Sequence, residues 1–67
     1  MALARNLKAA RKARGLTQVQ LAEASGVPRS DISDIENAKP SVNPTMTRLV
    51  RLAEVLGTTA GDLLSAV

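Results

Sequence analysis

The polar face of one short segment is the part of this sequence best suited to chemistry. At helical spacing it presents Ser30, Ser33, Asp34 and Asn37, with Arg29 on its flank. Neither serine is accompanied by the aspartate–histidine or lysine arrangement that activates a hydroxyl nucleophile, which argues against catalysis. The aspartates lack the spacing of a metal-binding loop, and the chain contains no histidine or cysteine. We therefore predict a hydrogen-bonding surface on a protein that is not an enzyme and uses no cofactor, metal or small-molecule ligand.

Charge is distributed unevenly along the 67 residues. The first 15 residues carry five bases and no acid, whereas the rest carry four bases and six acids. A basic segment suits a polyanion such as nucleic acid, although a solvated helix face explains the charge equally well. Single-stranded nucleic acid is disfavoured, because no aromatic residue is available for bases to stack on. No apolar run approaches the ~20 residues of a membrane span, so we expect no membrane contact.

Glycine and proline divide the chain into five short helical patterns, which predicts a single all-α domain over residues 1–67. The predicted helices cover residues 2–14, 17 to the turn at Gly26, 28–37, 45–56 and a short stretch after Thr59. Without aromatic residues the core must be aliphatic. The positions expected to face it are Leu3, Leu7, Ala10, Leu21, Ala22, Ser25, Ile32, Ile35, Met46, Leu49, Leu52, Ala53, Leu56, Leu63 and Leu64.

Three charged residues fall beside these apolar stripes. A helical wheel puts Arg11 and Arg14 on the flank of the first stripe and Glu36 on the flank of the third. A charge in such a place either pairs or extends its stem over apolar surface, so Arg11 requires a carboxylate partner elsewhere in the chain. Arg48 and Arg51 of the fourth helix are expected to be solvated.

Residues 18–37 have the layout of a helix-turn-helix. Ala22 stands where two helices cross, Gly26 stands at the turn, and Ile32 and Ile35 fix the second helix on the core. The chain resembles the Cro/C1-type (XRE-family) helix-turn-helix domain of phage repressors and their bacterial relatives. Three stretches, which together cover nearly the whole chain, carry the resemblance: ARKARGLTQVQLAEASGV, ISDIENAK and NPTMTRLVRLAEVLGTTAGDLL.

The resemblance implies a five-helix orthogonal bundle of the lambda-repressor-like kind, with residues 29–37 as a recognition helix in the major groove of double-stranded DNA. The positions that match the family's base-reading residues are Arg29, Ser30, Ser33 and Asp34. Those that match its phosphate contacts are Gln18, Asn37, Lys39 and Ser41. Arg11 and Glu36 match a structural ion pair between the first and third helices. A homodimer interface is implied at Leu56, Thr58, Thr59, Asp62 and Leu63.

The function implied is that of a transcriptional regulator, a repressor that binds a palindromic operator as a dimer. Its setting would be bacterial or phage-encoded, cytoplasmic and nucleoid-associated. The alternative is a protein-interaction module, such as the antitoxin or partner-binding component of a toxin–antitoxin pair.

Two residues depart from the family pattern. Relatives often carry an amide or a basic residue at Asp34 and usually carry glycine at Ala38. Three interpretations of the acidic third helix stay open: Asp34 accepts a hydrogen bond from cytosine N4, Asp31 stabilises the helix dipole from the first turn, or the surface docks a protein instead of DNA. Gln18 either contacts a phosphate or only supports the capping turn, and Arg29 either contacts DNA or is solvated.

Overall fold

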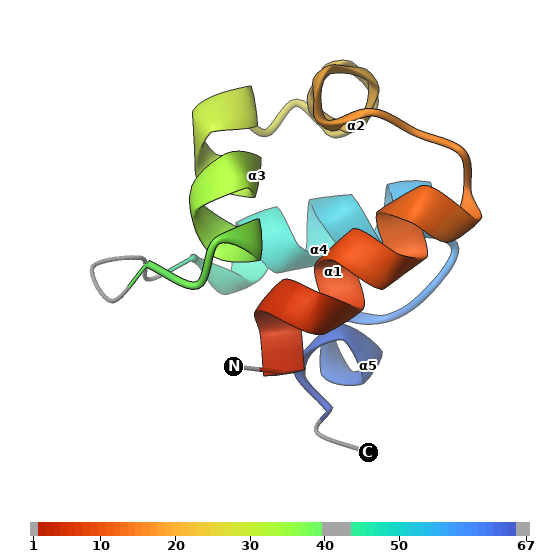
Figure 1. Ribbon diagram of the computed structural model, residues 1–67. Coiled ribbons are helices and arrows are strands. Elements are labelled where there is room, and N and C mark those ends of the chain that lie inside the picture. Colours follow the sequence, from red (N-terminus) through yellow and green to blue (C-terminus); the bar gives the residue numbers. More distant parts are fainter. Residues whose placement is uncertain (1, 40–43, 66–67) are drawn as a thin grey trace.

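The computed structural model describes residues 2–39 and 44–65, and these residues form five α-helices and no strand. The helices are α1 (Ala2–Ala13), α2 (Gln18–Ser25), α3 (Arg29–Glu36), α4 (Met46–Leu56) and α5 (Ala60–Leu64). In Figure 1, α1 and α4 run across the picture, α3 stands upright beside them and α2 is seen end-on. The predicted all-α orthogonal bundle is therefore confirmed. Within the described ranges, no helix combines the length and apolarity needed to cross a bilayer.

Threonine side chains begin three of the helices. The Thr17 hydroxyl accepts a hydrogen bond from the Gln20 backbone N–H at 3.1 Å, and the Gln20 side chain accepts one from the Thr17 N–H at 2.9 Å. This is the predicted capping box at the start of α2. Thr45 and Thr59 likewise accept from the third backbone N–H of α4 and α5. Each cap satisfies a donor that the helix leaves unpaired and contributes roughly 1 kcal/mol.

Three helices end in the same turn, in which two backbone hydrogen bonds close over a residue of positive φ. That residue is a glycine after α1 and after α4, with φ of 69° and 71°. After α3 it is Ala38, with φ of 53°. The Ala38 N–H donates to the Ile35 carbonyl at 3.0 Å, and the Lys39 N–H donates to the Asp34 carbonyl at 3.3 Å. The residue that departs from the family's glycine is thus held in a conformation that costs a side chain about 1–2 kcal/mol.

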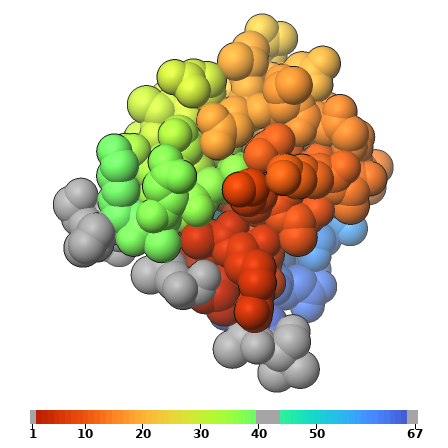
Figure 2. All heavy atoms as spheres, in the orientation of Figure 1, coloured from red at the N-terminus to blue at the C-terminus, as the bar shows by residue number. Residues whose placement is uncertain are grey.

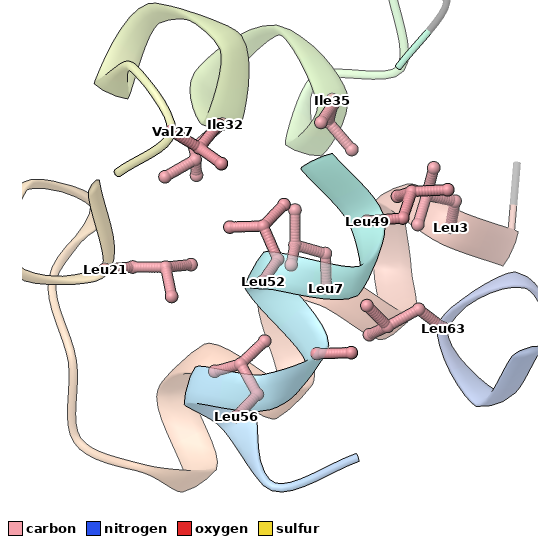
Figure 3. Close-up of a cluster of buried hydrophobic side chains, with 11 residues drawn as sticks. Leu3, Leu7, Leu21, Val27, Ile32, Ile35, Leu49, Leu52, Leu56 and Leu63 are labelled. Carbon is pink, nitrogen blue, oxygen red and sulfur yellow. The ribbon is translucent and has the colours of Figure 1, made fainter. Parts of the chain in front are cut away.

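Aliphatic side chains from all five helices meet in one core (Figure 3). Its members are Leu3, Leu7, Leu21, Val27, Ile32, Ile35, Leu49, Leu52, Ala53, Leu56 and Leu63. Two expected members are wrong, because Met46 is 58% exposed and Leu64 is 46% exposed. Met46 lies in the first turn of α4 on the flank of the buried stripe. Leu64 follows the buried Leu63 directly in a five-residue helix, so the two side chains point in different directions.

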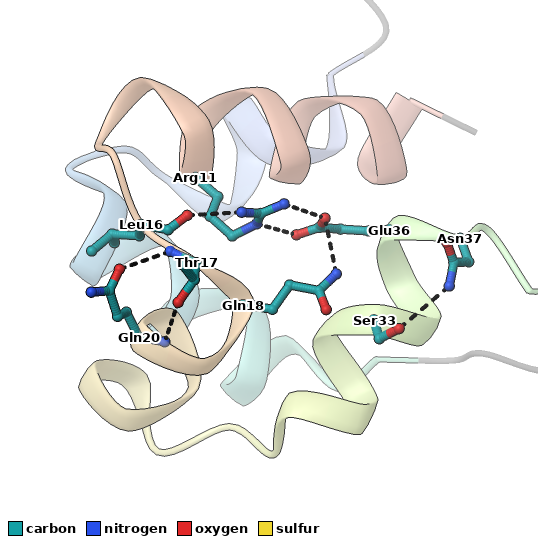
Figure 4. A network of polar contacts seen from close by, with 8 residues as sticks. All are labelled: Arg11, Leu16, Thr17, Gln18, Gln20, Ser33, Glu36 and Asn37. Atoms are coloured by element: carbon teal, nitrogen blue, oxygen red, sulfur yellow. Dashed lines mark hydrogen bonds and ion pairs between the residues drawn. The ribbon is translucent and has the colours of Figure 1, made fainter.

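A buried ion pair joins α1 to α3 (Figure 4). Arg11 Nε donates to Glu36 Oε2 at 2.8 Å and Arg11 Nη2 donates to Glu36 Oε1 at 2.9 Å. The remaining nitrogen, Nη1, donates to the Leu16 carbonyl at 2.8 Å. Only 11% of the Arg11 side chain and 3% of the Glu36 side chain are exposed. Arg11 and Glu36, which lie on the flanks of the apolar stripes of α1 and α3, are therefore partners, as the family resemblance implies.

Hydrogen bonding to Glu36 raises the pKa of Arg11 above its ordinary value, against the lowering effect of burial. A cation whose pKa is higher in the folded chain stabilises the fold below its unfolded pKa and loses that contribution only as the pH rises through the folded value. For an arginine this range lies far above neutrality. The Arg11 side of the pair is therefore charged at physiological pH.

Two more polar side chains, one in α1 and one in the residue that follows it, bind the ends of other helices. Asn6 Nδ2 donates to the carbonyls of Leu63 and Ser65 at 2.9 and 2.6 Å, at the end of α5. Arg14 Nε donates to the Leu56 carbonyl at 3.2 Å, at the end of α4. Through these contacts α1 and the residue after it bind carbonyls that would otherwise have no partner within their own helices.

We expect Ala38→Gly to stabilise the fold by roughly 1 kcal/mol. Relief of about 1–2 kcal/mol of positive-φ strain exceeds the roughly 0.5–1 kcal/mol of backbone entropy that glycine costs. Urea denaturation measures the change. Gly57→Ala is the matched control and should destabilise, because it places a Cβ at a φ of 71° in the same kind of turn and displaces the Arg14 guanidinium. A destabilising Ala38→Gly would show that the turn after α3 carries no strain.

We expect Glu36→Ala to destabilise the fold by about 3–5 kcal/mol, because it leaves the Arg11 charge buried without its partner. The change is read as a fall in melting temperature. Arg48→Ala is the control: it breaks an ion pair whose arginine is 46% exposed, and should cost less than about 1 kcal/mol. The double variant Arg11→Met/Glu36→Leu should recover most of the loss. An unchanged melting temperature for Glu36→Ala would contradict the structural role of the pair.

Candidate nucleic-acid interface

The turn between α2 and α3 determines which face of α3 is buried. Gly26 has a φ of 74°, a backbone conformation that glycine adopts without steric cost. Val27 is 2% exposed and anchors the turn in the core, and Pro28 precedes α3 with a φ of −56°. Proline fixes this angle, which suits the start of a helix. Ile32 and Ile35 are 0% and 3% exposed, so α3 is attached to the core by one side only.

The opposite side of α3 faces solvent. Figure 2 shows α3 along one edge of the molecule, with α1 across the face beside it. Arg29 and Ser30 are exposed at the start of the helix, and neither side chain has a hydrogen bond or ion pair within the described residues. They are therefore the two predicted base-reading residues whose polar groups are available without breaking a contact.

The other two predicted base-reading residues already have partners. Ser33 Oγ accepts a hydrogen bond from Asn37 Nδ2 at 3.3 Å (Figure 4). Asp34 Oδ1 lies 3.0 Å from Lys39 Nζ. In each case a predicted base-reading residue is bound to a predicted phosphate contact, so the structure joins the two sets of residues in pairs. The fourth predicted phosphate contact, Ser41, lies outside the described residues.

Gln18 is held by the buried ion pair. Its Nε2 donates to Glu36 Oε1 at 3.3 Å, the same oxygen that accepts from Arg11 (Figure 4). The side chain supports the capping turn less than it supports this network, because the cap itself is made by Thr17 and Gln20. An amide nitrogen carries two hydrogens, and one is still available for a phosphate. The phosphate contact of Gln18 stays a prediction.

All three acids of α3 are paired with a cation. Asp31 Oδ2 lies 2.7 Å from Arg48 Nη1, in addition to its place in the first turn of α3. Arg48 is solvated as expected, since its side chain is 46% exposed, but it also bridges α4 to α3, which the sequence did not indicate. The remaining pairs are Asp34–Lys39 and Glu36–Arg11. Asp31 points toward α4 and away from the solvent face, which leaves Asp34 as the acid available to read a base.

Two residues of the predicted dimer interface lie in the core. Leu56 is 5% exposed and Leu63 is 2% exposed, so their side chains pack inside the chain and are not available to a second copy. Thr58 Oγ1 donates to Asp62 Oδ2 at 3.3 Å, and Thr59 caps α5. Thr58, Thr59 and Asp62 remain at the surface, and so does Leu64, which was expected in the core. The shortness of the last predicted helix was the sequence feature that pointed to an exposed Leu64, because a helix of about one turn can bury only one side.

No group of three or more metal-ligating side chains lies together within the described residues. The surface instead offers a guanidinium, hydroxyls, an amide and one compensated carboxylate. This set matches the donors and acceptors that base edges and phosphates present in a DNA groove.

Comparison with known proteins identifies the family. A family model for the helix-turn-helix, HTH_3, matches residues 7–63. The chain is 44% identical over 57 residues to the immunity repressor protein of Bacillus phage phi105. The matched stretch covers 85% of this chain and 38% of that protein. It is 38% identical over 63 residues to control protein C.SmaI of Serratia marcescens, which covers 94% of this chain and 73% of that protein.

Among solved structures, a SinR protein/SinI protein complex matches with a TM-score of 0.88 and 33% identity, over 98% of this chain and 62% of that chain. The present chain therefore spans less than two thirds of the length of the phage repressor and of this structure. The match nevertheless covers both helices of the motif and the core that supports them. The chain belongs to the Cro/C1-type (XRE) helix-turn-helix family of DNA-binding transcriptional regulators.

Proposed function

We propose that this protein is a sequence-specific regulator that binds double-stranded DNA and represses transcription by occupying an operator. The observation that carries the proposal is the orientation of α3, with Ile32 and Ile35 buried and Arg29 and Ser30 exposed without partners among the described residues. A helix attached by one side can enter a major groove with the other. We also propose that the protein works at the bacterial nucleoid, where such an operator would lie.

In the proposed complex Arg29 binds the O6 and N7 acceptors of guanine, and Asp34 accepts from the N4 amino group of cytosine. Ser30 and Ser33 add contacts to either kind of base. Gln18, Asn37, Lys39 and Ser41 bind phosphates on either side of the groove. The family pattern supports these roles, and the exposure of the α3 face supports the geometry.

The predicted phosphate contacts include a single cation, Lys39. Each phosphate that a protein neutralises contributes about 0.9 to the slope of log K against log salt concentration. One subunit should therefore have a shallow salt dependence and modest affinity. A symmetric homodimer doubles the contacts, and we propose that the surface around Thr58, Thr59, Asp62 and the exposed Leu64 forms its interface.

Selection of bound duplexes from a random pool tests the proposal. We expect enrichment of a palindrome whose half-sites lie about 10 base pairs apart, one turn of DNA. Enrichment of a single half-site would overturn the dimer and leave the DNA-binding function. Failure to enrich any duplex, together with capture of a protein partner by the same preparation, would favour the alternative of a protein-interaction module.

We expect Arg29→Ala to weaken binding to the selected duplex by about 1–3 kcal/mol, the discrimination typical of a bidentate arginine–guanine contact. Binding to bulk DNA should fall much less. Fluorescence anisotropy with the two DNAs measures both losses. Equal losses would show that Arg29 contacts only the backbone.

We expect Asp34→Asn to change the preferred base at one position of each half-site, because an amide matches adenine N6 and N7 whereas a carboxylate only accepts. The measurement is a second selection with the variant. An unchanged selected sequence would contradict direct readout by Asp34.

A further inference from the structure

The ion pair between Asp34 and Lys39 joins two residues that need different partners on DNA. Their charged atoms are 3.0 Å apart, and the side chains are 37% and 55% exposed. Both atoms therefore face solvent on the side of the molecule that the proposed function directs at DNA. The closed pair still leaves Asp34 Oδ2 and two N–H groups of Lys39 unused. The DNA contact that competes with the pair is therefore one in which a phosphate draws the ammonium away from Asp34.

The turn after α3 keeps the pair assembled. The Lys39 backbone N–H donates to the Asp34 carbonyl at 3.3 Å, so the two residues are joined through main chain and side chain at once. Ala38 between them takes up the positive φ that the turn requires. The turn therefore brings Lys39 back against the last turn of α3, so its side chain lies beside Asp34 in the absence of any ligand.

The neighbouring charges do not substitute for either partner. Asp31 is bound to Arg48 of α4, and Glu36 is bound to Arg11 and Gln18 in the interior. Asp34 is thus the one acid of α3 whose compensating cation belongs to the proposed DNA-contacting set.

We infer that the Asp34–Lys39 pair makes the phosphate contact of Lys39 conditional on the base that faces Asp34. On an arbitrary sequence, release of Lys39 to a phosphate leaves the Asp34 carboxylate uncompensated against a polyanion, so one attraction is gained and one repulsion appears. Where an amino group of cytosine or adenine faces Asp34, the carboxylate gains a hydrogen bond and Lys39 is released to the backbone. Lys39 then determines specificity although it touches no base.

This inference rests on the proposed function, and its size follows from the exposure of the pair. Exposed ion pairs contribute about 0.2–1 kcal/mol, which corresponds to roughly 1.4-fold to fivefold in affinity. The coupling between Lys39 and the base should fall in the same range. It is large enough to measure and too small to unfold the chain when either residue is replaced.

The test compares four proteins on two duplexes. The proteins are the parent, Lys39→Gln, Asp34→Ala and the double variant. The duplexes are the selected site and the same site with the base pair facing Asp34 inverted, which places an acceptor where the amino group was. That base pair is the one whose preference changes in the Asp34→Asn selection.

In the parent background, we expect Lys39→Gln to lose about 1.4-fold to fivefold more affinity per half-site on the selected duplex than on the inverted one. In the Asp34→Ala background the two losses should be equal. The salt slope of the parent should be steeper on the selected duplex by about 0.9 for each half-site that is inverted, one phosphate contact per subunit, and Lys39→Gln should remove that difference. Lys12→Gln is the matched control: it removes one exposed positive charge from α1, and its loss should be the same on both duplexes.

Equal losses for Lys39→Gln on both duplexes in the parent background would overturn the inference and leave an ordinary phosphate contact and the proposed function intact. A selection that does not shift with Asp34→Asn would overturn it as well, since no base would then face Asp34. Absence of binding to any duplex would overturn the proposed function and the inference together.

Discussion

The geometry of the helix-turn-helix depends on one buried ion pair. The Arg11 guanidinium binds Glu36, the last residue of α3, and the carbonyl of Leu16, which lies just before α2. One side chain of α1 therefore holds both helices of the motif. Desolvation offsets much of the attraction within such a pair, and apolar residues would often stabilise as well. What the pair adds is direction, because its planar donors match a carboxylate in one orientation.

The same principle explains how α3 can be acidic and still face a polyanion. Each of its acids is compensated by a cation from a different element: α4 for Asp31, the turn after α3 for Asp34, and α1 for Glu36. The compensation is local, within hydrogen-bonding distance, so little negative field extends from the helix. Arg29 is left as an exposed charge at its start. The acidity seen in the sequence is therefore largely absent from the surface.

Local rules predicted most of the fold. The capping box at Thr17 and the glycine turns depend on residues within one turn of helix, so spacing alone reveals them. The wrong assignments lie at the margins of the apolar stripes: Met46 is on the flank of the α4 stripe and Leu64 directly follows the buried Leu63, and no other helix of the described residues covers either side chain. Periodicity also could not predict which side chains form ion pairs between different helices. The wheel showed that Arg11 needed a carboxylate, but only the family pattern indicated Glu36, and nothing indicated Arg48 for Asp31.

In the proposed function, the distribution of charge assigns the long-range attraction of DNA and the recognition of its bases to different parts of the protein. The net charge of +3 comes mainly from the first 15 residues, where Arg5, Lys8 and Lys12 are exposed. These bases attract DNA at a distance, over roughly 8–10 Å at physiological ionic strength, without regard to sequence. The α3 face is close to neutral, so it adds little to that attraction and must gain its affinity from matched hydrogen bonds. A nearly neutral reading face thus lowers binding to arbitrary DNA more than binding to the correct site, which raises the ratio that determines occupancy of an operator.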